Sequence, residues 1–336
     1  MIMSHIFVPL FDMITRNFEE KPKPNVIVVG YGWGGKAFCD NIDRSKYNIK
    51  VINKSDTFVN TPKLVNFKDL TSVTVPIKER VNMGEVTKIE ADKQTIHLNN
   101  EFVYNYDYLV VATGSIPNTF NIEGADSCHF YKTYDDAVAL NKSLESNTHY
   151  QIIGAGPTGI EVAFELAAEG KKVTLIEASN TILPNFSDAV REKVLMKLKK
   201  KDITLLLDHK VTRLNDSLIE TNKKQLPRYY TLWMSGIKPM PLVSEINKVD
   251  GNLKFNDTTY VLGDSIRGYG PPTAQNAKQQ GIYLANHFNN NFKSEPYKYN
   301  EWCKMLHTHD ALLIDYKNKC YSLPLITSDL IEHLLT

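Results

Sequence analysis

Two short stretches of the sequence combine glycines with a strand and a helix in a pattern that binds dinucleotides. The first is "VIVVGYGWGGKAF", residues 26–38, and the second is "YQIIGAGPTGIEVAF", residues 150–164. The GxGxxG glycines are Gly30, Gly32 and Gly35 in the first stretch and Gly154, Gly156 and Gly159 in the second. Such glycines allow a tight turn, close approach of a pyrophosphate to the backbone, and an anion site at the helix N-terminus. The spacing therefore predicts two nucleotide-binding loops.

The side chain that ends the next strand indicates what each loop binds. Glu177 ends the strand "KKVTLIE" about 18 residues beyond the second loop, where an acid accepts hydrogen bonds from an adenosine ribose. A carboxylate at this position repels a 2′-phosphate, and the following Ala178 and Ser179 supply no arginine, so we expect NADH rather than NADPH. The first strand ends at Asn53, which can bond a ribose without charge assistance. Its residues alone leave the ligand of the first loop open.

The elements around both loops predict an α/β fold. The strands "NVIVVG" and "YNIKVIN" flank a helix at "KAFCDNI", and "YQIIG" and "KKVTLIE" flank a helix at "GIEVAFELAAEG". Two βαβ units that each open on GxGxxG indicate an internal duplication of a doubly wound domain. Further along, "FSDAVREKVLMKLKKKD" predicts a helix with Val190, Val194, Leu195 and Leu198 facing inward. A last strand, "TTYVLGD", leads into a long helix at "PTAQNAKQQGIYLANHF".

Composition excludes several classes of function. The chain has 336 residues, 42% hydrophobic and 23% charged, with a net charge of +1, so no basic surface is expected to recruit nucleic acid. The four cysteines form no CxxC pair, and "HTHD" at residues 307–310 has no companion ligand cluster, so neither a disulfide framework nor a metal site is expected. No stretch approaches the roughly 20 apolar residues that span a bilayer, and no secretory or transit signal is expected at the N-terminus.

Three further segments join the glycine loops to a known family. They are "YDYLVVATGSIPN" (residues 106–118), "TLWMSGIKP" (231–239) and "YVLGDS" (260–265). Together these resemble the flavin-dependent pyridine nucleotide oxidoreductases, which bind FAD in one domain and NAD(P)H in an inserted one. A finer resemblance, to type II NADH:quinone oxidoreductases, lies in "SDTFVNTPKLV", "CHFYKTYDDA", "GAGPTGIEVAFELA" and "PPTAQNAKQQGIYLA".

The resemblance implies two Rossmann-like, doubly wound dinucleotide-binding domains in a glutathione-reductase-like arrangement, one for FAD and one for NAD(P)H, plus a short C-terminal α+β tail. The expected divisions are an N-terminal helical extension (1–23), the first part of the FAD domain (24–145), an inserted NADH domain (146–245), the second part of the FAD domain (246–295) and the C-terminal region (296–336).

The resemblance also assigns site residues. For FAD these are Gly30, Gly32, Gly35, Asn53, Thr61, Ala112, Thr113, Gly114 and Asp264; for NADH they are Gly154, Gly156, Gly159 and Glu177, and Gly236 completes the cofactor set. Gln275 and Gln279 lie on one helix face and are implied to line the place where a quinone meets the flavin, although spacing alone fits two exposed polar residues equally well. Glu161 is implied to lie near the nicotinamide, and it is equally explained as an acid favoured by the helix dipole.

The activity implied is that of a non-proton-pumping FAD-dependent NADH dehydrogenase, with hydride passing from NADH to FAD and two electrons then passing to a quinone or another small acceptor. The resemblance also implies a homodimer. It further implies either peripheral contact with a membrane that faces a reducing compartment or a cytoplasmic location. No Lys or Arg follows Lys319, so the tail is expected to bind an anionic membrane weakly. Two alternatives stay open: an apoptosis-inducing-factor-like or ferredoxin-reductase-like flavoprotein with a non-quinone acceptor, and a catalytically degenerate nucleotide-binding module.

Overall fold

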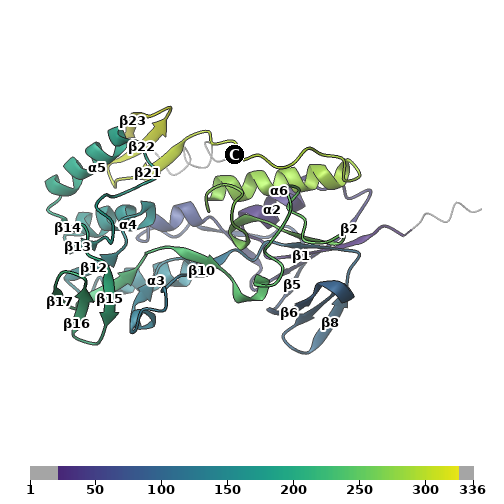
Figure 1. The fold of residues 1–336 in the computed structure, drawn as a ribbon, viewed down its shortest axis with the longest axis horizontal. Coiled ribbons are helices and arrows are strands. Elements are labelled where there is room, and N and C mark those ends of the chain that lie inside the picture. The colour runs from purple at the N-terminus through teal and green to yellow at the C-terminus, as the bar shows by residue number, and fades with distance from the viewer. Residues whose placement is uncertain (1–21, 325–336) are drawn as a thin grey trace, which may run out of the picture.

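The computed structural model describes residues 22–324 and arranges them as two lobes side by side (Figure 1). The expected N-terminal helical extension lies outside the described residues except for residues 22 and 23, and residues 325–336 of the expected C-terminal region also lie outside them. Each lobe is built on a parallel sheet. Between the lobes, β10 (Ser115–Pro117) pairs with β19 (Ile237–Pro239) as an antiparallel crossing.

The first lobe contains a five-stranded sheet in which every pairing is parallel. Its order is β20 (Thr259–Val261), β9 (Tyr108–Val111), β1 (Asn25–Val29), β2 (Asn48–Asn53) and β5 (Val81–Met83). The branched residues 26–29 of β1 are buried, which a central strand covered on both faces requires. Helices α2 (Trp33–Asn41) and α6 (Ala274–Asn289) pack together beside this sheet (Figure 1).

The second lobe repeats this plan. Its sheet runs β11 (His129–Phe130), β18 (Tyr230–Trp233), β12 (His149–Ile153), β13 (Lys172–Ile176) and β14 (Thr204–Leu206), again with parallel pairings throughout. Its helices are α3 (Tyr134–Ser143), α4 (Pro157–Ala168) and α5 (Asp188–Lys200). The predicted fold class, two Rossmann-like α/β units with a glutathione-reductase-like arrangement, is thereby confirmed.

Helix α5 corrects one detail of the sequence interpretation. Val190, Val194 and Leu198 are buried as predicted, whereas Leu195 is 41% exposed. Residues spaced by four already form a complete inward stripe on this helix, and Leu195 lies on its flank because each residue turns about 100° around the axis.

Short antiparallel sheets decorate both lobes. They are β3 (Thr57–Val59) with β4 (Thr74–Pro76); β6 (Val86–Glu90), β7 (Thr95–Leu98) and β8 (Phe102–Asn105); β15 (Val211–Leu214), β16 (Leu218–Thr221) and β17 (Gln225–Pro227); and β21 (Lys304–His307), β22 (Ala311–Tyr316) and β23 (Lys319–Pro324). The last sheet is the strand part of the expected tail, and it packs on α4 and α5 of the second lobe (Figure 1). Within residues 22–324, no helix combines the length and the apolar character that a bilayer crossing needs.

The small residues of α6 allow its backbone to touch that of α2. A Cβ atom added at Gly281 would clash with the carbonyl oxygen of Gly34, and one at Gly34 would approach the carbonyl oxygen of Ala277 at 3.2 Å. The small residues of α6 are therefore used for close packing of two helices. This contact fixes the start of α6 beside the first glycine loop.

Candidate functional site

The first glycine loop follows β1 and turns directly into α2. Gly30 has φ +94°, and its N–H donates to the carbonyl of Ile52 at 2.9 Å. A Cβ at Gly35 would clash with the carbonyl oxygen of Gly30, so this glycine brings the helix close to the strand. Gly32 is the N-cap of α2; it provides no capping side chain, and the space where its Cβ would point is open. The loop thus presents free helix N–H groups to an anion.

The second loop reproduces this geometry after β12. Gly154 has φ +112°, and its N–H donates to the carbonyl of Ile176 at 2.8 Å. A Cβ at Gly159 would clash with the carbonyl oxygen of Gly154, and Gly156 caps α4 with open space in front of it. The duplication predicted from the sequence therefore extends to individual hydrogen bonds and close approaches.

The two strand-end side chains occupy equivalent positions. Asn53 Oδ1 accepts the N–H of Tyr31 at 3.2 Å, and Glu177 Oε2 accepts the N–H of Ala155 at 2.7 Å. The other carboxylate oxygen of Glu177 accepts the N–H and the hydroxyl of Ser179, at 2.9 and 2.7 Å. Both side chains are held beside their loops, where a ribose bound there would meet them.

A cleft of about 690 Å³ lies between the lobes. The predicted residues that line it are Gly30, Gly32, Asn53, Thr61, Ala112, Thr113, Gly114, Glu161 and Asp264. The first glycine loop supplies one wall, and Pro272, Thr273 and Ala274 at the start of α6 supply another. Thr158 and Glu161 reach the same cleft from α4 of the second lobe. One cavity is thus shared by elements that follow both glycine loops.

Other predicted residues lie outside the lining of this cleft. Gly154, Gly156, Gly159 and Glu177 form the second loop, which leads into the cleft-lining part of α4. Gly236 has φ +119° and lies at the crossing between the lobes, where its carbonyl accepts the N–H of Asn118 at 3.0 Å.

The two predicted glutamines face the segment that follows α6. The hydroxyl of Tyr299 donates to Gln275 Oε1 at 2.8 Å. Gln279 pairs with the backbone of Asn300 in both directions, at 2.8 and 3.0 Å. Neither glutamine lines the cleft, and their suggested contact with a quinone stays a prediction.

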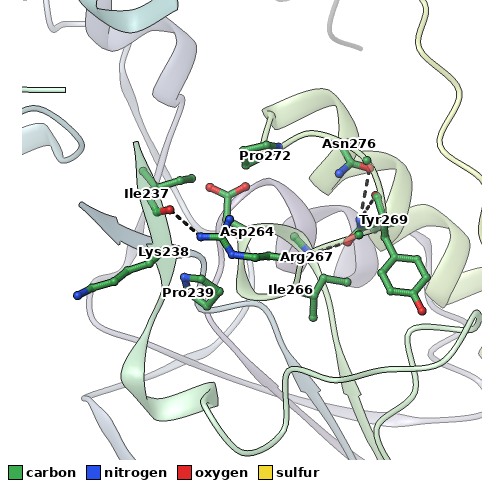
Figure 2. A pocket seen from close by; sticks show the side chains of 13 residues that line it. Ile237, Lys238, Pro239, Asp264, Ile266, Arg267, Tyr269, Pro272 and Asn276 are labelled. Carbon is green, nitrogen blue, oxygen red and sulfur yellow. Dashed lines mark hydrogen bonds between the residues drawn. The ribbon is translucent and has the colours of Figure 1, made fainter. Parts of the chain in front are cut away.

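Asp264 belongs to the 3-10 turn η5 (Gly263–Ser265), which follows β20. Its Oδ2 accepts the hydroxyl of Ser115 at 2.9 Å, and the buried Ser265 hydroxyl accepts the N–H of Gly114 at 2.9 Å. These bonds join η5 to the loop after β9 as one wall of the cleft. A smaller cavity of about 140 Å³ adjoins the cleft at Asp264 and Pro272, and Figure 2 shows its labelled lining residues.

The carboxyl group of Glu161, which lines the cleft, has a strongly raised pKa. Burial raises the pKa of its carboxyl to about 8, the nearby Glu165 adds to the rise, and a bond from the backbone N–H of His307 opposes it. That N–H donates to Glu161 Oε1 at 3.0 Å. The imidazole of His307 is no counter-ion, since burial lowers its pKa to about 4. The raised pKa favours the protonated form of Glu161 at neutral pH. Among residues 22–324, no group of histidine, cysteine and acidic side chains could hold a metal ion.

A comparison with protein families decides the membership of this chain. The model of the pyridine nucleotide-disulphide oxidoreductases matches residues 24–281, which include both glycine loops and most of α6. The chain belongs to this family. Its members are flavoproteins, and the family therefore implies binding of FAD and NAD(P)H.

Relatives with assigned names confirm the finer resemblance to alternative NADH dehydrogenases. An external alternative NAD(P)H-ubiquinone oxidoreductase B2, mitochondrial, of Arabidopsis thaliana is 28% identical over 314 residues, which cover 72% of this chain and 54% of the relative. A probable NADH dehydrogenase of Dictyostelium discoideum is 29% identical over 337 residues, covering 81% and 74%. This member of the family thus spans about half the length of several curated relatives.

Solved structures show the same fold. NDH2 from Plasmodium falciparum in complex with NADH superposes with a TM-score of 0.84 at 20% identity, covering 93% of this chain and 94% of that one. The fold of that structure therefore extends over most of this chain.

The residues present fit the two nucleotides that the family implies. At Gly32 and at Gly156 a Cβ would occupy open space in front of an uncapped helix start. By contrast, α3 and α6 are capped by the side chains of Thr133 and Thr273. Both helices that the dinucleotide pattern selects start without a capping side chain, as α5 also does at Ser187, and the open space in front of Gly32 and Gly156 leaves room for an anionic ligand at each loop.

Several residues in the cleft were missed by the sequence interpretation. Trp33 Nε1 donates to the hydroxyl of the predicted Thr61 at 3.2 Å, and Ser115 and Lys132 both contact Asp264. Thr158 lines the cleft from α4. Lys132 and Thr158 stand inside the stretches that carry the family resemblance, "CHFYKTYDDA" and "GAGPTGIEVAFELA", but no residue spacing sets them apart from their neighbours.

Proposed function

We propose that this protein is a FAD-dependent NADH dehydrogenase that delivers two electrons to a quinone. The observation that carries the proposal is the single cleft between the lobes, which takes walls from the first glycine loop and from Glu161 and Thr158 of α4. Such a cleft lets a nicotinamide held by the second lobe approach a flavin held by the first. The FAD and NADH domain boundaries expected from the sequence are part of the same proposal.

The first lobe would hold FAD. The free N–H groups at Gly32 suit the pyrophosphate, Asn53 suits the adenosine ribose, and Asp264 suits a hydroxyl of the ribityl chain. Ala112, Thr113 and Gly114 are small enough to let the backbone lie against the cofactor. When bound, FAD accepts a hydride equivalent and passes electrons onward, while the protein supplies orientation and charge.

The second lobe would select NADH over NADPH. The carboxylate of Glu177 is held by the N–H groups of Ala155 and Ser179, so its charge remains where an adenosine 2′-position would lie. A 2′-phosphate would meet this negative charge without a cation from Ala178 or Ser179. A 2′-hydroxyl, in contrast, can donate a hydrogen bond to the carboxylate.

Glu161 would hold a proton beside the nicotinamide. Its Oε1 is occupied by the backbone N–H of His307, which leaves Oε2 as the oxygen that carries the proton. With a pKa of about 8, the group is a neutral hydrogen-bond donor at pH 7 and adds no negative charge to the cleft. A neutral carboxyl can donate to the carbonyl oxygen of a nicotinamide carboxamide, which a carboxylate cannot do.

The quinone half of the proposal rests on the relatives, whose names include ubiquinone, and on α6. The Nε2 amide of Gln275 has no hydrogen-bond partner among residues 22–324, while its Oε1 is held by Tyr299. This amide could donate to a quinone carbonyl. A homodimer and weak peripheral membrane contact remain predictions that accompany this function.

Anaerobic mixing tests the proposal directly. Purified protein should carry a yellow flavin that NADH bleaches faster than NADPH, and a short-chain quinone should restore the colour. Gln275→Ala should slow re-oxidation by quinone while leaving bleaching by NADH unchanged. Protein without flavin, or bleaching that is faster with NADPH, would contradict the proposal. If NADH bleaches the flavin but quinone does not re-oxidise it, the proposed NADH dehydrogenase activity is retained and quinone is rejected as the acceptor.

A further inference from the structure

A lysine of the second lobe reaches the carboxylate of Asp264 in the first lobe. Lys132 follows β11, the edge strand of the second sheet, whereas Asp264 follows β20, the edge strand of the first. Lys132 Nζ lies 3.5 Å from Asp264 Oδ2, and both side chains line the cleft. Within residues 22–324, no other cation pairs with Asp264. The nearby Arg267 instead donates to the carbonyl of Ile237 at 2.9 Å, as the dashed line in Figure 2 shows.

The backbone at Lys132 is fixed by the start of α3. Asp136 Oδ2 accepts the N–H groups of Lys132 and Thr133, both at 2.8 Å. In return, the N–H of Asp136 donates to the Thr133 hydroxyl at 3.1 Å, which completes a capping box. The lysine side chain therefore extends toward Asp264 from a rigid point, and 30% of it is exposed.

The two oxygens of Asp264 are used unequally. Oδ2 accepts both the Ser115 hydroxyl at 2.9 Å and the Lys132 ammonium at 3.5 Å. Oδ1 has no hydrogen-bond partner in the part of the chain that the structure describes. Both donors therefore engage the same oxygen, which leaves Oδ1 available as an acceptor.

We propose that Lys132 is a positioning residue for the flavin: it holds Asp264 so that Oδ1 can accept a cofactor hydroxyl, and it supplies a cation from the second lobe to the flavin site. This inference rests on the proposed function, because it takes FAD as the occupant of the cleft. Charge-assisted bonds orient a carboxylate more firmly than neutral ones. A fixed positive charge in a partly enclosed cleft also favours negative charge on the reduced cofactor, and so raises its reduction potential.

The test compares Lys132→Met, Lys132→Arg and Lys88→Met in the full-length flavin-loaded protein. Lys88 is the matched control: it is 60% exposed on β6 and pairs with Glu90. The measurements are the fraction of FAD retained on serial dilution, and the midpoint potential from anaerobic dye titration. Lys132→Met should bind FAD about tenfold more weakly and shift the potential to a more negative value. Lys132→Arg should restore most of both, and Lys88→Met should match the wild type.

Each outcome separates this inference from the proposed function. If wild-type protein retains FAD and Lys132→Met shows the same affinity and potential, Lys132 does not position the site. If Lys132→Arg is as weak as Lys132→Met, the charge is not what matters, and the inference fails as well. Wild-type protein that binds no FAD would overturn the proposed function itself. Far-UV circular dichroism guards against misfolding. Asp264→Asn gives a second variant, in which adding Lys132→Met should weaken FAD binding little further but should still shift the potential to a more negative value.

Discussion

The two glycine loops share a backbone and differ in the side chains around it. In each, the first glycine donates to an isoleucine carbonyl of the neighbouring strand, at 2.9 Å from Gly30 and 2.8 Å from Gly154. In each, the next N–H donates to the strand-end side chain, which is the neutral Asn53 in one case and the charged Glu177 in the other. We propose that the backbone of each loop holds a phosphate and that the strand-end side chain decides which nucleotide is accepted.

The surroundings of the loops differ as strongly. The first loop lines the cleft of about 690 Å³, and its helix α2 is covered by α6. The second loop lies outside that lining, and its helix α4 contributes Thr158 and Glu161 to the cleft. A nucleotide on the first loop would be enclosed, whereas one on the second would enter and leave more readily. This arrangement suits a resident cofactor and an exchangeable substrate.

Alanine at the third glycine of either loop should have the largest effect, because it should abolish nucleotide binding at that loop alone. A Cβ at Gly35 or at Gly159 would clash with the carbonyl oxygen of Gly30 or Gly154, so each loop should open, at a cost of about 1–3 kcal/mol or more. Gly35→Ala should lose bound flavin, while Gly159→Ala should stay yellow but lose bleaching by NADH. Absorbance spectra and anaerobic mixing measure both. Loss of flavin from Gly159→Ala with an intact circular dichroism spectrum would show that the loops are not independent.

Removing the charge of Glu177 should weaken the preference of the second loop for NADH over NADPH. Glu177→Gln keeps the shape and one acceptor oxygen but no longer repels a 2′-phosphate. The ratio of kcat/KM for NADH over NADPH should fall about tenfold, as expected for a change of about 1.4 kcal/mol. Asn53→Gln is the control in the first loop and should leave this ratio unchanged. An unaltered ratio in Glu177→Gln would remove Glu177 as the selecting residue.

Glu161 should make both the free energy of unfolding and the rate of bleaching by NADH depend on pH, and Glu161→Gln should remove its contribution. Because the pKa rises from 4.5 to about 8, the folded protein keeps a proton that the unfolded chain releases between these values. The free energy of unfolding should therefore decrease as pH rises through this window, since the folded state binds more protons. Thermal melting across the window should show a shallower decline in Glu161→Gln. Bleaching by NADH should also change near pH 8 in the wild type only; identical profiles for the two proteins would contradict the assignment.

The smallest expected effect concerns the neutral side chain of the first loop. Asn53→Ala removes the acceptor for the Tyr31 N–H and the donor to the Ser55 carbonyl, a bond of 2.9 Å. Loss of such neutral bonds costs about 1 kcal/mol, so FAD should bind about fivefold more weakly. The fraction of flavin retained on dilution measures this effect. A loss as large as that of Gly35→Ala would mean that the side chain, rather than the backbone, holds the nucleotide.

Local sequence was sufficient for much of the fold. The buried run at residues 26–29 and the glycines after it predict strand, turn and helix because these elements depend on neighbours a few residues away. The same holds for Glu177, which a single βαβ unit brings beside its loop. Leu195 shows where local periodicity fails, since the width of the inward stripe depends on what packs against α5.

The sequence by itself determined the duplicated loops, the parallel sheets and the family, because hydrophobic periodicity and glycine spacing involve residues that are close together in the chain. Only the tertiary structure decided which side chains meet across the lobes. Lys132 and Asp264 are 132 residues apart, and Glu161 and His307 are 146 apart, so no period or spacing links them. The docking of the lobes and of the C-terminal sheet brings these groups together. The resulting burial raises the pKa of Glu161, and Lys132 lies 3.5 Å from the carboxylate of Asp264.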